Sequence, residues 1–399
     1  MLSRLWVCLC SVGSPLRWAA AARWLSLALL SAVAAGCWSG SGRMTVDADP
    51  YAAFCPPVTG PATLTEETPD AGEGTPACDT PPPPSPLVGW ANVPGSGNSA
   101  VSIDATTGGG DTPMVTVTTL TDLNTNLMGS TPAVVLLSGT VTGTVRIGSN
   151  KTLIGTCGAQ VVGHLQISNA SNVIVRNLKI TGYNCTDSAA VAAQDCSAGP
   201  DAVTISGAHH VWFDHDDISD GSDGNLDINQ AADNITISWT KFYYSGARTD
   251  PAGAGGGHQF SDLIGSSDNS TSDAGHLRVT FHHDWWGQNA YERMPRVRFG
   301  QIHLFNNLWS SLGNAYCVGL GVSANVLVEN NVFRMVRDPF DVTDYASPDS
   351  VLESRGNLFE KTTGNVAGKG GPATAPPYEY AAEDPCLITD AIMALSGPR

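Results

Sequence analysis

The chain has 399 residues, a formal net charge of −17 and only 14% charged residues, and it contains 43 glycines. This length accommodates one large domain or two small ones, and few charges with frequent glycine are typical of a β-rich extracellular protein. The excess of acidic residues argues against nucleic-acid binding, because a phosphate backbone attracts basic surfaces.

The first 36 residues have the features of a bacterial secretory leader. Arg4, Arg17 and Arg23 come before or at the start of a mostly apolar run over 24–35, which leads into Ala34-Ala-Gly-Cys37. The run is too short to span a bilayer comfortably, and small residues before a cysteine suit a signal peptidase. We expect 1–36 to be a lipoprotein-type signal peptide and Cys37 to be lipidated, which makes the protein secreted and membrane-anchored. An ordinary signal peptide with an incidental Cys37 is the alternative.

Residues 37–84 are rich in Pro, Thr, Gly, Asp and Glu and end in four prolines at 81–84, so we interpret them as a flexible linker. Three of the ten cysteines, Cys8, Cys10 and Cys37, belong to the leader or open the linker. The remaining number is odd, so at least one cysteine has no partner within the rest of the chain. Cys185 and Cys196 flank one loop and form the first candidate disulfide. Cys55 and Cys78 form the next candidate pair. No partner is assigned to Cys157, Cys317 or Cys386.

A repeat dominates the chain after the linker. The alternating segment 172–180 recurs in outline at 210–218, 234–242, 276–284, 301–309 and 325–333. Four of the steps between first apolar residues, counted on to Val351, are close to 24–25 residues, and the longer steps contain inserts around 184–200 and 248–273. A strand that returns at a fixed period predicts stacked coils, because each coil buries its apolar side chains only against its neighbours.

The predicted fold is therefore all-β, a right-handed parallel β-helix over 85–365, followed by a C-terminal tail over 366–399. Asn177, Asn307, Asn331 and Asn357 are expected at one corner of successive coils, with their amides hydrogen-bonded along the stack. A β-sandwich or barrel is the alternative, but it does not explain the fixed period.

Two segments contain the candidate chemistry. The arginine-rich segment is Arg293-Met-Pro-Arg-Val-Arg298, and the acidic segment Asp223-Gly-Asn-Leu-Asp227 lies some 70 residues earlier. In a strand-like segment, Asp223 and Asp227 share one face. Carboxylate oxygens are the ligands that Ca²⁺ prefers, and guanidinium groups bind carboxylates in bidentate fashion. A simple Asp-Gly turn and arginines paired with surface acids are the structural alternatives.

With these segments, the stretches Trp212-Phe-Asp-His215, Thr106-Thr-Gly-Gly109 and 141–155 make the chain similar to the pectate lyase family from about Gly89 to Phe359. The resemblance implies a calcium-dependent enzyme that cleaves polygalacturonate by β-elimination to 4,5-unsaturated oligogalacturonides. It also implies a polygalacturonate or pectin partner and a parallel β-helix. We further expect a monomer that meets a membrane only through its lipid.

The resemblance assigns roles residue by residue. Asp201, Asp223 and Asp227 match the family's calcium ligands, and three carboxylates leave places in the shell for water and substrate. Arg293 matches the proposed general base, and Arg298 matches the arginine that binds a substrate carboxylate. The neighbouring Arg296 shares the strand face of Arg298 and joins it as a substrate-binding candidate.

The chain departs from the family at two places. Gly199 occupies a position that is acidic in many relatives, and no lysine stands near Gly246, where relatives usually place one for substrate binding. Arg248 is the candidate substitute for that lysine. Asp214 and His215, although characteristic of the family, are interpreted as structural.

Three other functions stay open at this point. A lyase for methyl-esterified pectin generally needs no calcium, and the retained aspartates argue against it. A non-catalytic carbohydrate-binding β-helix on the cell surface would have no need of Arg293 and Arg298. A hydrolase requires a general acid near a nucleophile or water, and no sequence pattern selects such a pair.

Overall fold

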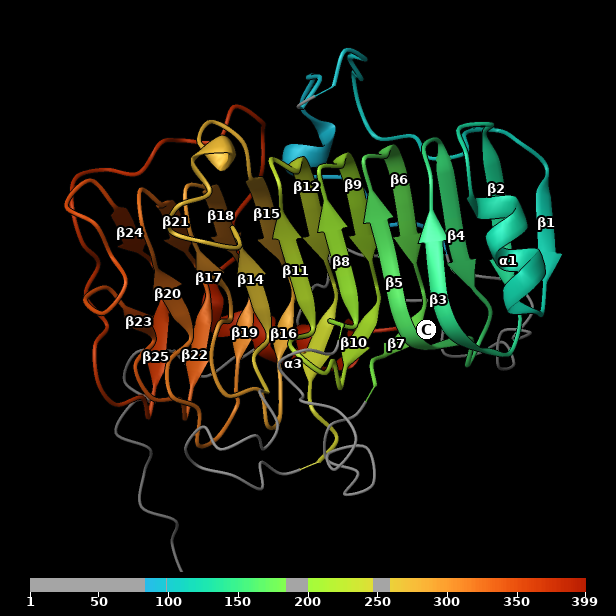
Figure 1. Cartoon of the computed structure of the whole chain (residues 1–399). Coiled ribbons are helices and arrows are strands. Elements are labelled where there is room, and N and C mark those ends of the chain that lie inside the picture. The colour runs from blue at the N-terminus through green and yellow to red at the C-terminus, as the bar shows by residue number, and fades with distance from the viewer. Residues whose placement is uncertain (1–82, 98, 184–199, 247–258) are drawn as a thin grey trace, which may run out of the picture. The chain divides into compact units, whose positions relative to one another are not determined.

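The computed structural model describes residues 83–97, 99–183, 200–246 and 259–399. Their strands pair in parallel in a 10-stranded and a 15-stranded sheet (Figure 1). From β6 on, each full coil adds one strand to the first sheet and two strands to the second. The predicted parallel β-helix is confirmed. The first sheet contains β1 (Met114–Val117), β2 (Ala133–Leu137), β4 (Lys151–Gly155), β6 (Ser171–Arg176), β9 (His209–Asp214), β12 (Asp233–Ser238), β15 (Arg278–His282), β18 (Gln301–Phe305), β21 (Asn325–Glu329) and β24 (Val351–Arg355).

The second sheet has two arms that meet at the long strand β5 (Gln160–Ser168). The N-terminal part of β5 pairs with β7 in one arm, and its C-terminal part pairs with β8 in the other. On the other side of β5, β3 (Thr140–Ile147) pairs along both halves of that strand. The arm that we call the site face contains β8 (Val203–Ser206), β11 (Leu226–Asn229), β14 (Asp262–Ile264), β17 (Arg296–Val297), β20 (Val318–Leu320) and β23 (Phe340–Asp341). The opposite arm contains β7 (Lys179–Thr181), β10 (Asp217–Ser219), β13 (Lys241–Tyr243), β16 (Trp285–Trp286), β19 (Leu308–Trp309), β22 (Val332–Arg334) and β25 (Leu358–Glu360).

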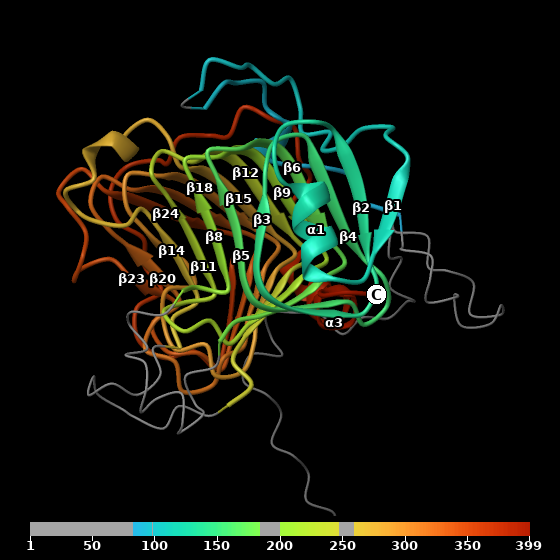
Figure 2. The same cartoon turned by 45° about the vertical axis from the view of Figure 1, so that its right-hand side comes forward.

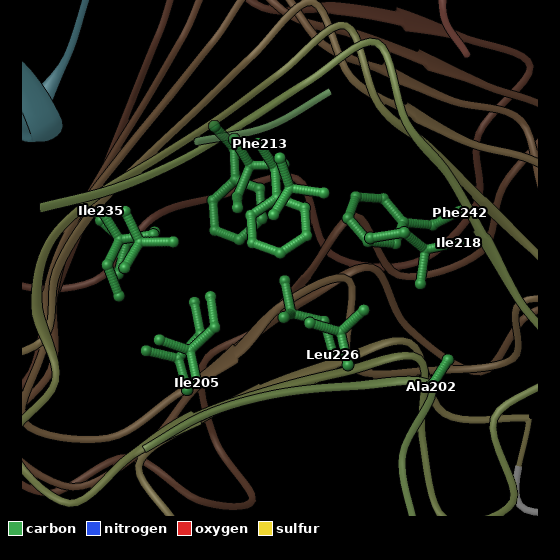
Figure 3. Close-up of a cluster of buried hydrophobic side chains, with 14 of the residues drawn as sticks. Ala202, Ile205, Phe213, Ile218, Leu226, Ile235 and Phe242 are labelled. Atoms are coloured by element: carbon green, nitrogen blue, oxygen red, sulfur yellow. The ribbon is translucent and has the colours of Figure 1, made fainter. Parts of the chain in front are cut away.

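Equivalent positions of successive coils stack inside the helix. Phe242, Trp286, Trp309 and Phe333 lie in one such column, with adjacent ring centroids 5.5, 4.6 and 4.4 Å apart. Apolar side chains from the first sheet and from both arms of the second sheet meet in the interior (Figure 3). Each fully buried large apolar side chain stabilises the fold by roughly 1.5–3 kcal/mol, so the repeat itself supplies the core.

The predicted asparagine stack forms in three of its four members. The Asn307 side-chain amide donates to Asn331 Oδ1 at 3.0 Å, and the Asn331 amide donates to Asn357 Oδ1 at 2.9 Å. Asn177 does not share this column, which corrects the prediction. It lies one position earlier, in the left-handed region with φ 56°, and its amide donates to the Gly155 carbonyl. Asparagine suits both places, because it tolerates positive φ and also forms amide ladders.

Both ends of the described chain pack along the solenoid. In η1 (Trp90–Asn92) the backbone N–H of Trp90 donates to Thr280 Oγ1, which fixes the N-terminal segment across the first sheet. α1 (Leu120–Leu127) covers the N-terminal end of the coils (Figure 2). α3 (Pro385–Leu395) packs Ile388 and Ile392 against the opposite arm, and the Arg399 N–H donates to Asn177 Oδ1, beside β7 in Figure 1. Residues 369–399 thus run back along the coils as an ordered segment.

Three further observations complete the fold. η3 (Thr271–Asp273) is a short turn in the loop after β14. Within the described ranges, no helix has the length and apolar character needed to cross a bilayer. Cys157 and Cys317 are free thiols, and Cys386 is disulfide-bonded. The predicted pair Cys185–Cys196, together with Cys55 and Cys78, falls outside the described residues.

Candidate active site

A single row of outward-facing positions crosses the site face. The sheet register aligns Asp227 with Leu263, Leu263 with Arg296, Arg296 with Gly319 and Gly319 with Asp341. Side chains alternate between the two faces of a strand, and the neighbours of these positions on β11, β14, β17 and β20 are buried. Adjacent strands lie about 4.8 Å apart, so Asp227 and Arg296 are two strand spacings from each other on one surface.

The three predicted calcium ligands come from two adjacent coils. Asp201 lies two residues before β8, Asp223 lies in the turn before β11, and Asp227 lies within β11. The Ala202 N–H donates to the Gly224 carbonyl at 3.0 Å, which brings Asp201 beside that turn. A Cβ at position 224 would lie 3.0 Å from Asp201 Oδ1, so glycine leaves room for the carboxylate.

Asn225 holds this acidic turn from inside. It is fully buried, its Oδ1 accepts the Gly221 N–H at 3.2 Å, and its amide donates to the Tyr243 carbonyl at 3.2 Å. Because both hydrogen bonds are internal, the turn presents Asp223 and Asp227 outward while Asn225 points inward.

The carboxylates are close enough to change one another's charge state. Burial, followed by repulsion from Asp227 and Asp223, raises the pKa of Asp201 to about 9. Burial and Asp223 raise the pKa of Asp227 to about 7, against the opposing effect of Arg293 and Arg298. Buried carboxylates that repel one another favour a nearby cation, and an all-oxygen donor set fits Ca²⁺. In the described part of the chain, however, no group of three His, Cys, Asp or Glu residues by itself forms a metal cage.

Arg293 lies at the edge of a coil, with φ 59° and before a cis Met294–Pro295 bond. Its guanidinium carbon is 3.9 Å from the Phe260 ring centroid, and its Nε is 3.7 Å from Glu292 Oε1. This stacking positions the guanidinium beside the carboxylates, because Arg293 is close enough to Asp227 to lower the pKa of that group.

Arg296 and Arg298 are held in different ways. The Arg296 guanidinium carbon is 3.6 Å from the Tyr345 ring centroid, and burial together with Arg298 and Arg293 lowers its pKa. Arg298 is buried, its Nε lies 2.5 Å from Asp268 Oδ1, and its Nη1 donates to the Gly265 carbonyl at 2.7 Å. The three predicted arginines therefore gather at one end of the acidic site.

The remaining predicted residues have different outcomes. Arg248 and Cys37 lie outside the described residues. Asp214 and His215 are buried, with His215 Nδ1 3.0 Å from Asp214 Oδ1, as expected for a structural pair. Lys241 stacks on the Tyr243 and Trp285 rings in the opposite arm, so it does not replace the missing lysine of the site face.

The residues that support the arginines were missed from the sequence. Phe260, Asp268 and Tyr345 come from loops between coils, where no period constrains the residue type. The only available signal was an aromatic or acidic residue in a loop next to the arginine strand, and this signal is weak.

Comparison with known proteins agrees with this geometry. The sequence model of the family described as pectate lyase matches residues 85–392. Pectate lyase plyB of Emericella nidulans is 34% identical over 263 residues, which cover 62% of this chain and 72% of the relative. The pectate trisaccharide-lyase of Thermotoga maritima is 34% identical over 248 residues, which cover 60% of each chain.

Solved structures agree in fold. A pectate lyase bound to a hexasaccharide superimposes with a TM-score of 0.60 at 23% identity, over 78% of this chain and 96% of that one. The family match extends over most of the described coils and includes the acidic and arginine-rich parts of the site face. The chain belongs to the pectate lyase family and is a polysaccharide lyase.

Proposed function

We propose that the chain is a calcium-dependent lyase that cleaves α-1,4-linked polygalacturonate by β-elimination and releases 4,5-unsaturated oligogalacturonides. The observation that supports this proposal is the position of Arg293 beside Asp227, at the junction of three carboxylates and three arginines. A polymer of carboxylates needs such an arrangement, because an acidic protein binds it only through cations or a local arginine cluster.

In this proposal, Asp201, Asp223 and Asp227 would hold calcium, with water and substrate carboxylates completing the shell. Bound there, calcium would supply positive charge next to the substrate carboxylate and so acidify the proton on the adjacent carbon 5. Arg298 and Arg296 would bind neighbouring carboxylates, and Arg248 is the proposed additional contact.

Arg293 is the proposed base. In its neutral form it takes the proton from carbon 5, the freed electron pair forms the carbon 4–5 double bond, and the glycosidic oxygen leaves carbon 4 with the bonding pair and takes up a proton from water. A free guanidinium stays protonated well above neutral pH. We therefore expect the rate to rise with alkaline pH.

The test is the ultraviolet absorbance of the unsaturated product formed from polygalacturonate, with and without a chelator. Absorbance that appears only with calcium supports the proposal. Saturated products with new reducing ends would indicate a hydrolase. Full activity on esterified pectin in chelator would indicate the pectin lyase alternative, and binding without any product would indicate a non-catalytic binding protein.

We also propose that the mature protein is a monomeric, secreted lipoprotein anchored through Cys37. The sequence of the leader supports secretion and the anchor. Cys37→Ser should move the protein from the membrane fraction to the soluble fraction, because several acyl chains are needed for stable anchoring. Unchanged fractionation would exclude a lipid at this cysteine.

A further inference from the structure

A cavity of about 430 Å³ lies at the C-terminal end of the site face, and the Arg296 guanidinium stacks on Tyr345 in its lining. Its lining includes Glu292, Tyr316, Asp341, Asp344 and Tyr345. Asp341 belongs to the same outward row as Arg296, two strands further along the stack. The cavity therefore continues the surface on which a sugar chain would lie.

Tyr316 in this cavity has an unsatisfied polar group. The residue is only 5% exposed, and its hydroxyl makes no hydrogen bond within the described residues. The ring lies over Gly319, where a Cβ would approach it to 2.8 Å, and its centroid is 6.1 Å from that of Tyr345. An unmade hydrogen bond at a buried hydroxyl costs about 1–3 kcal/mol, and a bound ligand with a polar atom here would recover it.

The part of the cavity around Asp341 and Asp344 disfavours a carboxylate, whereas the Arg296 guanidinium lies against Tyr345 in another part of the lining. Asp338 is paired with Arg337 at 3.0 Å, but within the described chain no ion pair joins Asp341 or Asp344 to a basic side chain. Asp341 Oδ1 accepts the backbone N–H groups of Thr343 and Asp344, each at 3.1 Å, which fixes this carboxylate at the rim. Like charges at close range repel, so an anionic sugar is penalised here.

We propose that this cavity is a subsite for an uncharged, methyl-esterified galacturonosyl residue of the substrate. Esterification keeps the shape of the sugar, removes the charge that Asp341 and Asp344 would repel, and leaves oxygen atoms for the Tyr316 hydroxyl. The two tyrosine rings give the sugar apolar surface. The inference rests on the proposed function, and it makes sparsely esterified pectin a better substrate than fully de-esterified polygalacturonate.

Kinetics with two substrates of matched length test this subsite. Asp341→Asn combined with Asp344→Asn should raise kcat/KM on polygalacturonate about fivefold and change kcat/KM on sparsely methyl-esterified galacturonan less than about twofold. Tyr316→Phe should lower kcat/KM on the esterified substrate about tenfold and spare polygalacturonate. Asp390→Asn, an exposed acid on α3, is the matched control and should change neither value.

Two results would overturn the inference while the proposed function stands. One is an equal effect of the variants on both substrates, and the other is a raised calcium requirement in the double variant, which would make the acids a cation site. Calorimetry measures the affinity of the same variants for methyl-esterified and for free trigalacturonate, and this affinity does not depend on catalysis. If no unsaturated product forms from either substrate, the proposed function fails, and equal affinity of wild type for both trisaccharides then rejects the subsite as well.

Discussion

Arg293 and Phe260 stack on each other, with the guanidinium carbon 3.9 Å from the ring centroid, although they lie on different coils. A cation over an aromatic face gains roughly 0.5–2 kcal/mol, depending on how well it is desolvated. The ring therefore fixes the plane of the guanidinium beside the carboxylates, in the position that the proposed base requires.

Replacing Arg293 by lysine should lower turnover by about two orders of magnitude or more. Lysine keeps the positive charge but loses the planar group that stacks on Phe260, and a positioned base contributes about this factor. The rate of unsaturated product formation, with circular dichroism as the folding check, measures the effect. Arg334→Lys, at an arginine paired with Glu360 on the opposite arm, is the control. Near-normal turnover in well-folded Arg293→Lys would remove this residue as the base.

Arg298→Lys should raise KM about tenfold and change kcat less. The guanidinium already contacts Asp268 and the Gly265 carbonyl, so its remaining donors are oriented for a substrate carboxylate, and an ammonium cannot reproduce that fork. Steady-state kinetics on polygalacturonate separate the two constants. Asp268→Asn keeps Arg298 but removes the ion pair. If it raises KM as much as Arg298→Lys does, Arg298 acts by holding its loop rather than by binding substrate.

Asp227→Asn should lower activity at limiting calcium by about tenfold, and excess calcium should partly restore it. The amide keeps one oxygen ligand and removes one negative charge, which weakens calcium binding without emptying the position. Calcium titrations of wild type and variant give the two midpoints. Asp390→Asn, at an exposed acid on α3 away from the site face, is the control variant and should leave the midpoint unchanged. Identical midpoints for wild type and Asp227→Asn would argue that this carboxylate is not a ligand.

The sequence predicted the fold well, because a period near 24 residues has few structural solutions. The sequence placed Asn177 wrongly in the stack of hydrogen-bonded asparagines. The position of that stack and the preceding position with positive φ are one residue apart in each coil, and asparagine is suited to both. The site was predicted through short local segments around Asp227 and Arg293. Phe260 and Tyr345 escaped prediction because each belongs to a loop whose contacts depend on how the coils stack.

Glu329 should make the stability of the fold dependent on acid pH. This carboxylate is buried, and burial alone raises its pKa, but hydrogen bonds from His303, Arg355 and Tyr380 outweigh burial and lower the pKa to about 2. The Tyr380 hydroxyl donates at 2.5 Å, so the contact also fastens the C-terminal segment to β21. A carboxylate with a depressed folded-state pKa stabilises the fold at pH values above its ordinary value of 4.5.

The stabilisation by Glu329 should be complete at neutral pH and should disappear as the pH falls from about 4.5 to about 2. Glu329→Gln should therefore lower the melting temperature at pH 7 by several degrees, because a hydrogen bond to a charged group contributes about 1.5–3 kcal/mol. The difference from wild type should shrink steadily below pH 4.5. Glu379→Gln, at an exposed acid next to Tyr380, should leave melting unchanged at every pH. A gap between wild type and Glu329→Gln that stays constant down to pH 2.5 would show that Glu329 stabilises the fold through packing rather than through its charge.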